Sequence, residues 1–251
     1  MLRGSKVCHL LFMPLIEAKN LKKTYRSDGT ATPVLHGLTF SIEAGEFVAI
    51  MGPSGCGKST LLHILGFLDR HSSGTYRFGG KTIDDFTENE IARVRNKRMG
   101  FVFQAFNLLG RESVLENVKL PLLYSGINEK LWDEMATKAI EAVGLSHRLE
   151  HEASKLSGGE KQRAAIARAL VMKPDVIFAD EPTGNLDSKS GQQVMEIIQN
   201  LNGSGGHTVV LITHETYTAE MAKRVIRLKD GEIEKDTRVA SRRYAKDNFV
   251  K

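Results

Sequence analysis

The sequence predicts an α/β fold with a largely parallel sheet, and three observations support this fold class. Several apolar runs of strand length end at polar residues, which is typical of strands that are buried on both faces. A glycine-rich loop at residues 52–60 joins one of these runs to an apolar helical segment. Residues 105–155 show helical rather than strand periodicity, which indicates a helical insertion between two parts of the α/β core.

Composition and charge are those of an ordinary globular protein. The 251 residues are 41% hydrophobic and 26% charged, which suits one large or two small domains. A net charge of +5 without a concentrated basic arm does not favour a nucleic-acid partner. No run reaches the about 18–20 apolar residues that a membrane span needs. The two cysteines, Cys8 and Cys56, form no disulfide framework and favour a reducing compartment.

Residues 1–14 are predicted to be an N-terminal extension. Their apolar stretch resembles a signal peptide but has no small-residue cleavage site. Met13 and Pro14 look like a natural beginning of the chain. We therefore hypothesise that Met13 is the functional start and that the first twelve residues are dispensable.

The part of the chain before and after the glycine-rich loop predicts a small antiparallel sheet. Apolar and polar residues alternate at 15–19 and 38–42, as in half-buried strands, and a turn-rich loop at 26–30 lies between them. A short strand at 75–78 and a charged helix at 88–96 follow.

The glycine-rich loop has the pattern G-x-x-x-x-G-K-[ST] of a P-loop, and it lies between strand and helix as that motif requires. Its glycines let successive backbone N–H groups converge, and the helix N-terminus adds partial positive charge. We expect Lys58 to reach the β- and γ-phosphates of a nucleotide and Ser59 to bind Mg²⁺. The predicted phosphate site consists of Gly52, Pro53, Ser54, Gly55, Cys56, Gly57, Lys58, Ser59 and Thr60.

Polar residues that follow other predicted strands suit the same chemistry. The strand before Gln104 could lie beside the P-loop strand, so that its amide reaches Mg²⁺ or the attacking water. Asp180 is placed to hold Mg²⁺ and Glu181 to polarise a water, while His214 could contact a γ-phosphate. Tyr25 is either a platform for adenine or an ordinary strand aromatic. The strands are expected at residues 46–51, 99–103, 175–181 and 209–213.

A second phosphate-binding helix terminus is predicted at the end of the helical insertion. Ser157 and Glu160 have the spacing of a capping box, which alone indicates only the start of a helix. Gly158 and Gly159 leave backbone N–H groups open at that terminus. One nucleotide site needs one such terminus, so the second is expected to serve another copy of the chain.

The helical insertion carries more leucine than its size requires, with helices expected at 114–120, 130–143 and 146–151. These leucines either form the core of the insertion or line a groove for a partner helix, and helical spacing does not separate the two. They are Leu108, Leu109, Leu120, Leu122 and Leu123.

The C-terminal part predicts a helix at 192–201 and a β-hairpin with a type I′-compatible turn at Asp230 and Gly231. Residues 235–251 are polar and basic. They are predicted to be a solvated helix or frayed tail, with weak contact to anionic lipid as the alternative.

The motifs in this order resemble the ATP-binding subunits of ABC transporters over residues 15–234. Tyr25 matches the aromatic residue that stacks on adenine in this family. After it come the P-loop, a Q-loop at Gln104 and the signature LSGGE at 156–160. A Walker B strand ending at Asp180, the carboxylate Glu181, a D-loop ending at Asp187 and the switch residue His214 complete the series. Residues 101–109, 116–122 and 179–187 are similar to the lipoprotein-release and macrolide-export branch. Gly110 and Arg111 depart from it, because a proline is expected nearby.

The resemblance implies a P-loop NTPase core, in which a mixed, mainly parallel sheet has helices on both faces. It adds an N-terminal antiparallel β subdomain and an inserted helical subdomain. The ATPase domain would comprise a core at 15–104 and 161–234 and a helical subdomain with the signature at 105–160. The extension at 1–14 and the basic tail at 235–251 would lie outside it.

The resemblance also implies an ATP hydrolase that powers export of lipoproteins, peptides or drugs by a separate membrane permease. Two chains would close head to tail around two ATP molecules, with Ser157 and Gly159 on the γ-phosphate that the other chain's Lys58 holds. Mg²⁺ would bridge Ser59, Gln104 and the phosphates, with Asp180 nearby. The subunit would be soluble when isolated and peripheral at the cytoplasmic face of the inner membrane.

Other functions fit the same residues less completely. A regulatory ABC-type ATPase that signals to a membrane partner without moving cargo would have the same active site. A soluble ABC ATPase acting on DNA or ribosomes would usually carry a long coiled coil or a second ATPase domain, and a P-loop kinase would not explain the signature. The cargo does not follow from the motifs.

Overall fold

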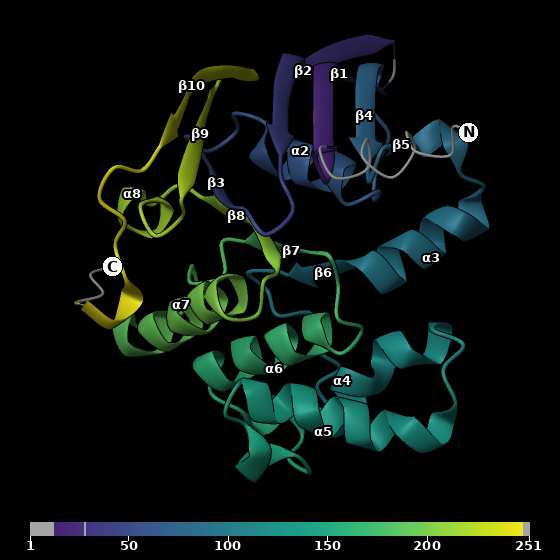
Figure 1. The fold of residues 1–251 in the computed structure, drawn as a ribbon, viewed down its shortest axis with the longest axis vertical. Coiled ribbons are helices and arrows are strands. Elements are labelled where there is room, and N and C mark those ends of the chain that lie inside the picture. The colour runs from purple at the N-terminus through teal and green to yellow at the C-terminus, as the bar shows by residue number, and fades with distance from the viewer. Residues whose placement is uncertain (1–12, 28, 248–251) are drawn as a thin grey trace, which may run out of the picture.

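Two sheets and the helix between them organise the fold in the computed structural model, which describes residues 13–27 and 29–247 (Figure 1). The hypothesis about residues 1–12 lies outside the described residues. In spatial order, the strands of the larger sheet are β10 (Glu232–Arg238), β9 (Arg224–Lys229), β3 (Phe47–Met51), β8 (Thr208–Thr213), β7 (Val176–Asp180) and β6 (Met99–Val102). Those of the smaller sheet are β2 (Thr30–Ile42), β1 (Ile16–Ser27), β4 (Ser73–Phe78) and β5 (Lys81–Thr82).

The central strands of the larger sheet, β3, β7 and β8, are buried on both faces, which explains their continuous apolar runs. Strands β9, β3, β8, β7 and β6 pair in parallel, and β10 closes an antiparallel hairpin with β9. Successive residues of β3 belong to different core clusters: Phe47 packs with the helices of one face, and Val48 packs with α2 (Lys58–Leu65) and the smaller sheet. Alternate strand residues therefore join two separate cores, and both need to be apolar.

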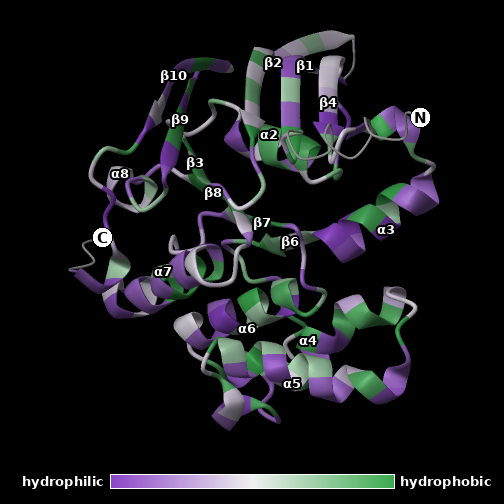
Figure 2. Cartoon of the chain, in the orientation of Figure 1, coloured by the Kyte–Doolittle hydropathy of each residue, from purple (hydrophilic) through white to green (hydrophobic). Residues whose placement is uncertain are grey.

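The predicted antiparallel sheet is confirmed, although its first two strands run longer than their apolar alternation suggests. Strands β1 and β2 pair along most of their length, and β4 pairs with the other edge of β1. Helix α2 lies between the two sheets, and its apolar residues join one core with residues from both. Figure 2 shows this helix as largely hydrophobic. The hairpin turn is also confirmed, because Asp230 and Gly231 both have positive φ, 47° and 76°.

The prediction that the strand before Gln104 lies beside the P-loop strand is wrong. Strand β6 pairs with β7, so β8 and β7 separate it from β3. Apolar periodicity identifies a buried strand but carries no information about its neighbours.

A helical layer covers the other face of the larger sheet. Helices α4, α5 and α6 pack on one another, and α6 also contacts β6 and α7. Helix α6 begins directly after Ser157, which caps it, as the spacing of Ser157 and Glu160 predicts. The α-helices are α3 (Glu88–Arg98), α4 (Val114–Lys119), α5 (Trp132–Ala142), α6 (Gly158–Leu170), α7 (Ser188–Gly203) and α8 (Thr216–Ala219). The short 3-10 helices are η1 (Ile83–Asp85), η2 (Leu120–Tyr124), η3 (Glu129–Leu131), η4 (Ser146–Arg148), η5 (Ala153–Lys155) and η6 (Ala245–Asp247).

The leucines of the insertion divide between the two interpretations. Leu122 is fully buried and belongs to the core. Leu109 and Leu123 are about half exposed, at 49% and 54%, and Leu123 precedes the exposed Tyr124 in the chain. The insertion thus has its own core and still presents apolar side chains to its surroundings. Within the part of the chain that the structure describes, no helix is both long and apolar enough to cross a membrane.

The C-terminal segment is neither a solvated helix nor a frayed tail as far as residue 247. Its first residues complete β10, and residues 239–247, here called the C-terminal strap, pack against α7 and α8. Ala245 is fully buried, and Arg243 pairs with Glu220. The buried amide of Gln199 donates to the carbonyls of Met221 and Arg243 and accepts from the N–H of Ala245. Side-chain hydrogen bonds from a distant helix, which the polar composition does not reveal, order this segment.

We predict that Gln199→Ala lowers the free energy of unfolding by about 1–3 kcal/mol, because it leaves buried backbone groups of the strap without partners. Urea unfolding measures the change. Gln193→Ala is the matched control, since Gln193 is exposed on the same helix, and it should change stability by less than about 0.5 kcal/mol. Equal effects of the two substitutions would contradict the anchoring role of Gln199.

Candidate active site

A pocket of about 670 Å³ opens where β3, β7 and β8 end. Parallel strands place their carboxyl ends at one edge of the sheet, so the P-loop and the polar residues after the other strands meet there. The lining residues are Val34, Pro53, Ser54, Gly55, Gly57, Lys58, Ser59, Thr60, Gln104, Asp180, Glu181 and His214. Gln104, Asp180, Glu181 and His214, predicted separately, thus face the P-loop across one cavity.

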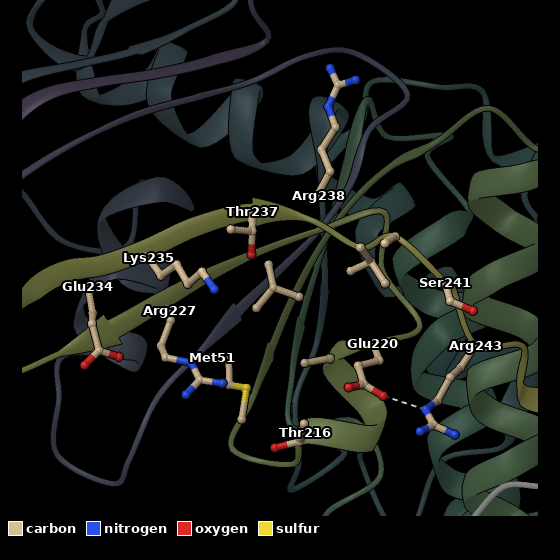
Figure 3. Close-up of a pocket in the computed structure, with 14 residues that line it drawn as sticks. Met51, Thr216, Glu220, Arg227, Glu234, Lys235, Thr237, Arg238, Ser241 and Arg243 are labelled. Carbon is tan, nitrogen blue, oxygen red and sulfur yellow. Dashed lines mark hydrogen bonds and ion pairs between the residues drawn. The ribbon is translucent and has the colours of Figure 1, made fainter.

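A larger cavity of about 740 Å³ lies elsewhere, between the β9–β10 hairpin, α8 and the C-terminal strap (Figure 3). Its lining includes Arg227, Lys235 and the Glu220–Arg243 ion pair. It contains no residue of the P-loop and neither carboxylate of the β7 end. The pocket at the P-loop is therefore the candidate site for phosphate chemistry.

The P-loop needs its glycines for conformation and for space. Gly57 has φ 99°, and a Cβ there would lie 2.8 Å from Cδ2 of Leu35, closer than carbon atoms pack. Gly57 is also the N-cap of α2, and no side chain caps this helix. Its first N–H groups are therefore available to an anion. The Lys58 ammonium donates to the carbonyls of Gly52 and Pro53, at 2.8 Å each, which holds it in the loop.

The end of β7 combines a perturbed acid with a constrained one. Burial raises the pKa of Asp180, and the neighbouring Glu181 carboxylate raises it further. Glu181 has φ 44°, a left-handed conformation that costs a residue with a side chain about 1–2 kcal/mol. Its N–H donates to the carbonyl of Ile212 at 2.9 Å, and its Oε1 lies 2.8 Å from Nδ1 of His214. The backbone bend turns this carboxylate toward the histidine at the pocket edge.

The residues present fit a magnesium ion. Ser59, Gln104 and Asp180 line the same pocket and offer hydroxyl, amide and carboxylate oxygens, which are the donors that Mg²⁺ prefers.

Asn185 forms a contact with Gln104 that the sequence did not predict. The Gln104 amide donates to Oδ1 of Asn185 at 3.3 Å, and the Asn185 amide donates to the Gln104 carbonyl at 3.1 Å. A Cβ on Gly184 would lie 2.5 Å from Nε2 of Gln104. The only signal in the sequence was the turn-like pair of Gly184 and Asn185. The D-loop residue Asp187 caps α7 by accepting from the N–H of Ser190, and it lies outside the pocket lining.

Two predicted P-loop residues and Tyr25 do not line the pocket. Cys56 is buried and, with Gly52, stands outside the pocket lining; a Cβ on Gly52 would lie 2.3 Å from the carbonyl oxygen of Leu228. Tyr25 also stands outside the lining, and its hydroxyl donates to Asp69 at 3.0 Å. The Lys23 ammonium lies 4.6 Å from the centre of the Tyr25 ring.

The LSGGE segment begins a helix away from this pocket. Ser157 Oγ accepts from the N–H of Glu160 at 3.3 Å, and the Glu160 carboxylate accepts from the N–H of Ser157 at 2.9 Å, so the predicted capping box is present. Burial alone would raise the pKa of Glu160, but bonds from Ser157 and Arg148 outweigh it and lower the pKa to about 2. A Cβ on Gly159 would lie 2.7 Å from Oγ of Ser190, so this glycine also allows α6 to pack on α7. Residues 157–160 do not line the pocket of their own chain.

The comparisons agree on one family. The ABC transporter family pattern matches residues 35–184. The chain is 47% identical over 227 residues to the macrolide export ATP-binding/permease protein MacB of Syntrophobacter fumaroxidans, which covers 90% of this chain and 32% of that protein. It is 47% identical over 219 residues to the ABC transporter ATP-binding protein YknY of Bacillus subtilis, which covers 87% of this chain and 95% of that protein. The chain therefore spans about a third of the length of the MacB relatives it matches.

A solved structure gives the same result. The dimeric cassette MJ0796 bound to ADP and Pi in a post-hydrolysis state is 39% identical, has a TM-score of 0.82, and covers 90% of this chain and 99% of its own. Fold and site thus define a P-loop nucleoside triphosphatase. Within that class, the chain belongs to the ABC transporter family as an ATP-binding cassette.

The left-handed backbone of Glu181 leads to a stability prediction. Glu181→Gly should unfold with a free energy about 1 kcal/mol higher than Glu181→Ala, because glycine adopts positive φ without the Cβ clash. Both variants lack the carboxylate and its bond to His214, so their difference isolates the backbone cost. Urea unfolding of the two proteins checks this, and an alanine variant as stable as the glycine variant would show that the backbone bend carries no strain.

Proposed function

We propose that this chain hydrolyses ATP in a head-to-tail dimer with a second copy and thereby drives export by a separate membrane permease. The observation that carries the proposal is the pair of helix termini. Helix α2 opens into the pocket without a side-chain cap, whereas the terminus at Ser157 does not line the pocket of its own chain. A second copy placing its Ser157 terminus over the first copy's P-loop would complete the site, and the dimeric state of the cassette MJ0796 supports assembly from two copies.

In the proposed mechanism, each residue acts where the pocket places it. The loop N–H groups and Lys58 bind the β- and γ-phosphates, and Ser157 and Gly159 of the partner copy bind the γ-phosphate from the opposite side. Glu181 takes a proton from the attacking water. His214 is hydrogen-bonded to Glu181, orients the Glu181 carboxylate and contacts the γ-phosphate. Ser59, Gln104 and Asp180 would hold Mg²⁺, which supplies positive charge against the phosphate oxygens when bound.

The remaining predicted residues act at the edges of this site. Tyr25 would stack on adenine after its ring gives up the contact with Lys23, since 41% of the tyrosine is exposed. Asp187, at the start of α7, would meet the partner copy near the shared nucleotide. Closure around ATP and reopening after hydrolysis would then provide the motion used for transport.

The permease is proposed to dock on the helical insertion. Its exposed apolar side chains are Leu109, Leu123, Tyr124 and Leu131. Exposed apolar groups of this size favour a protein partner. Fusion of the corresponding cassette to a permease in the MacB relatives supports a membrane partner, which would hold this subunit peripherally at the cytoplasmic face of the inner membrane. By analogy with the macrolide-export relatives, the cargo would be a drug, and the resemblance of the motifs to the lipoprotein-release branch would also suit a peptide or lipoprotein.

Glu181→Gln is expected to slow ATP hydrolysis by about 10²–10⁴ while ATP binding persists, because the amide cannot accept the proton. The same variant should accumulate an ATP-bound dimer. Phosphate release assays and size-exclusion chromatography with ATP measure the two effects. Hydrolysis at the rate of the unaltered protein would remove Glu181 from the role of base.

Mixing two inactive variants tests the shared site. Lys58→Ala disables the P-loop, and Ser157→Asp keeps a good N-cap but places a negative charge against the partner's γ-phosphate. Each variant alone should be inactive, whereas an equimolar mixture should hydrolyse ATP, because half of the sites in mixed dimers combine an intact P-loop with an intact Ser157. Ser157→Thr keeps cap and hydroxyl and should remain active. A mixture as inactive as its components would argue against the head-to-tail site.

A further inference from the structure

The loop that follows Gln104 has an unusual backbone. Phe106 and Asn107 are consecutive residues with positive φ, 60° and 51°. Asparagine tolerates this conformation better than most residues, but phenylalanine does not. The ring of Phe106 packs against the core cluster on the helical face of the sheet, so packing fixes this side chain. The loop therefore keeps its bend only if further contacts hold the backbone.

Arg168 supplies those contacts from α6. Its Nη1 donates to the carbonyl of Asn107 at 2.5 Å, and its Nη2 donates to the carbonyl of Phe106 at 2.9 Å. The planar guanidinium fork can hold two adjacent carbonyls only when both point the same way, as consecutive left-handed residues present them. The left-handed bend thus presents two carbonyls in the arrangement that the Arg168 guanidinium can bind.

No carboxylate pairs with Arg168 among residues 13–27 and 29–247. Burial lowers the pKa of its guanidinium, which is the expected effect of withdrawing a cation from water. A half-buried arginine without an acidic partner depends on its carbonyl acceptors. The two loop carbonyls are those acceptors.

The same loop is fixed on both sides of this clamp. Toward its start, Gln104 exchanges hydrogen bonds with Asn185. Toward its end, the fully buried Asn117 accepts from the N–H of Leu109 and donates to its carbonyl. Arg168 therefore joins the middle of this loop to α6, the helix that Ser157 caps.

We propose that Arg168 is a positioning residue for Gln104, because it holds the left-handed bend at residues 106–107 and so keeps Gln104 at the edge of the phosphate pocket. The proposal rests on the proposed role of Gln104 as a Mg²⁺ ligand. It also makes α6 the link between the two halves of a shared site. Ser157, the N-cap of α6, is proposed to contact the partner's nucleotide. A displacement of α6 would therefore move the loop that carries Gln104.

The first test is hydrogen–deuterium exchange of the full chain without nucleotide or metal, followed by mass spectrometry. In Arg168→Ala, amides at residues 105–112 should exchange about 10-fold faster, because two hydrogen bonds from a charged group are lost. Arg163→Ala is the matched control: it removes an arginine from the same helix, and within the described residues no hydrogen bond joins the Arg163 side chain to this loop. Its loop should exchange at the rate of the unaltered protein.

The second test measures the free Mg²⁺ concentration that gives half-maximal ATP hydrolysis. Arg168→Ala should raise this concentration about 3- to 10-fold, in keeping with the loss of a positioning contact. Adding Asn107→Gly to Arg168→Ala should bring it part of the way back, because glycine adopts positive φ freely. A merely structural role for Arg168 predicts no such rescue. If Arg168→Ala does not fold, Arg168→Lys keeps the charge without the fork and should show intermediate effects in both tests.

Unchanged loop exchange in a folded Arg168→Ala protein would overturn the proposal. So would faster exchange with an unchanged Mg²⁺ requirement, because the bend would then not position Gln104. Gln104→Ala separates this proposal from the one on which it rests. If Gln104→Ala leaves the Mg²⁺ requirement unchanged, the proposed ligand role of Gln104 fails, while the exchange result still reports whether Arg168 holds the loop.

Discussion

The site depends on a helix terminus that its own side chains leave uncapped. Helix α2 is enclosed between two sheets, and its N-cap Gly57 contributes no side-chain bond. The first N–H groups of a helix need partners, and here the P-loop aims them into a cavity lined by Lys58 and two carboxylates. Since packing in the core between the two sheets fixes the helix, these donors cannot turn away. A phosphate is the ligand that fits N–H groups held in this way.

Helix α6 shows the opposite solution. Ser157 and Glu160 satisfy each other in a capping box, and Arg148 holds the Glu160 carboxylate. This terminus is stable without a ligand, yet Ser157 remains exposed and can meet a second molecule. The contrast suits a site made in two halves: one half holds the nucleotide before assembly, and the other keeps its shape until a partner arrives.

Sequence patterns predicted the motifs well because each depends on local chemistry. Glycine spacing, apolar strands with polar ends, and the capping box can all be read within a few residues. Strand order, the bond between Gln104 and Asn185, and the anchoring of the C-terminal strap by Gln199 depend on residues far apart in the chain, so composition could not show them. The contact of Arg168 with the loop carbonyls could not be predicted for the same reason, since an arginine in an amphipathic helix usually indicates only a solvated face.

Three of the non-glycine residues with positive φ lie where the chain leaves a strand to form the site. Glu181 follows β7, and Phe106 and Asn107 follow β6, all with positive φ. A left-handed residue persists only where its surroundings determine it, and each of these bends is held from a different element: Glu181 by β8 and His214, the loop by α6. Helix α6, which holds the loop bend through Arg168, also packs Gly159 against α7. In the proposed dimer, a partner's nucleotide at the first turn of α6 would therefore be connected to the leucines beyond residue 107 through packing and hydrogen bonds alone.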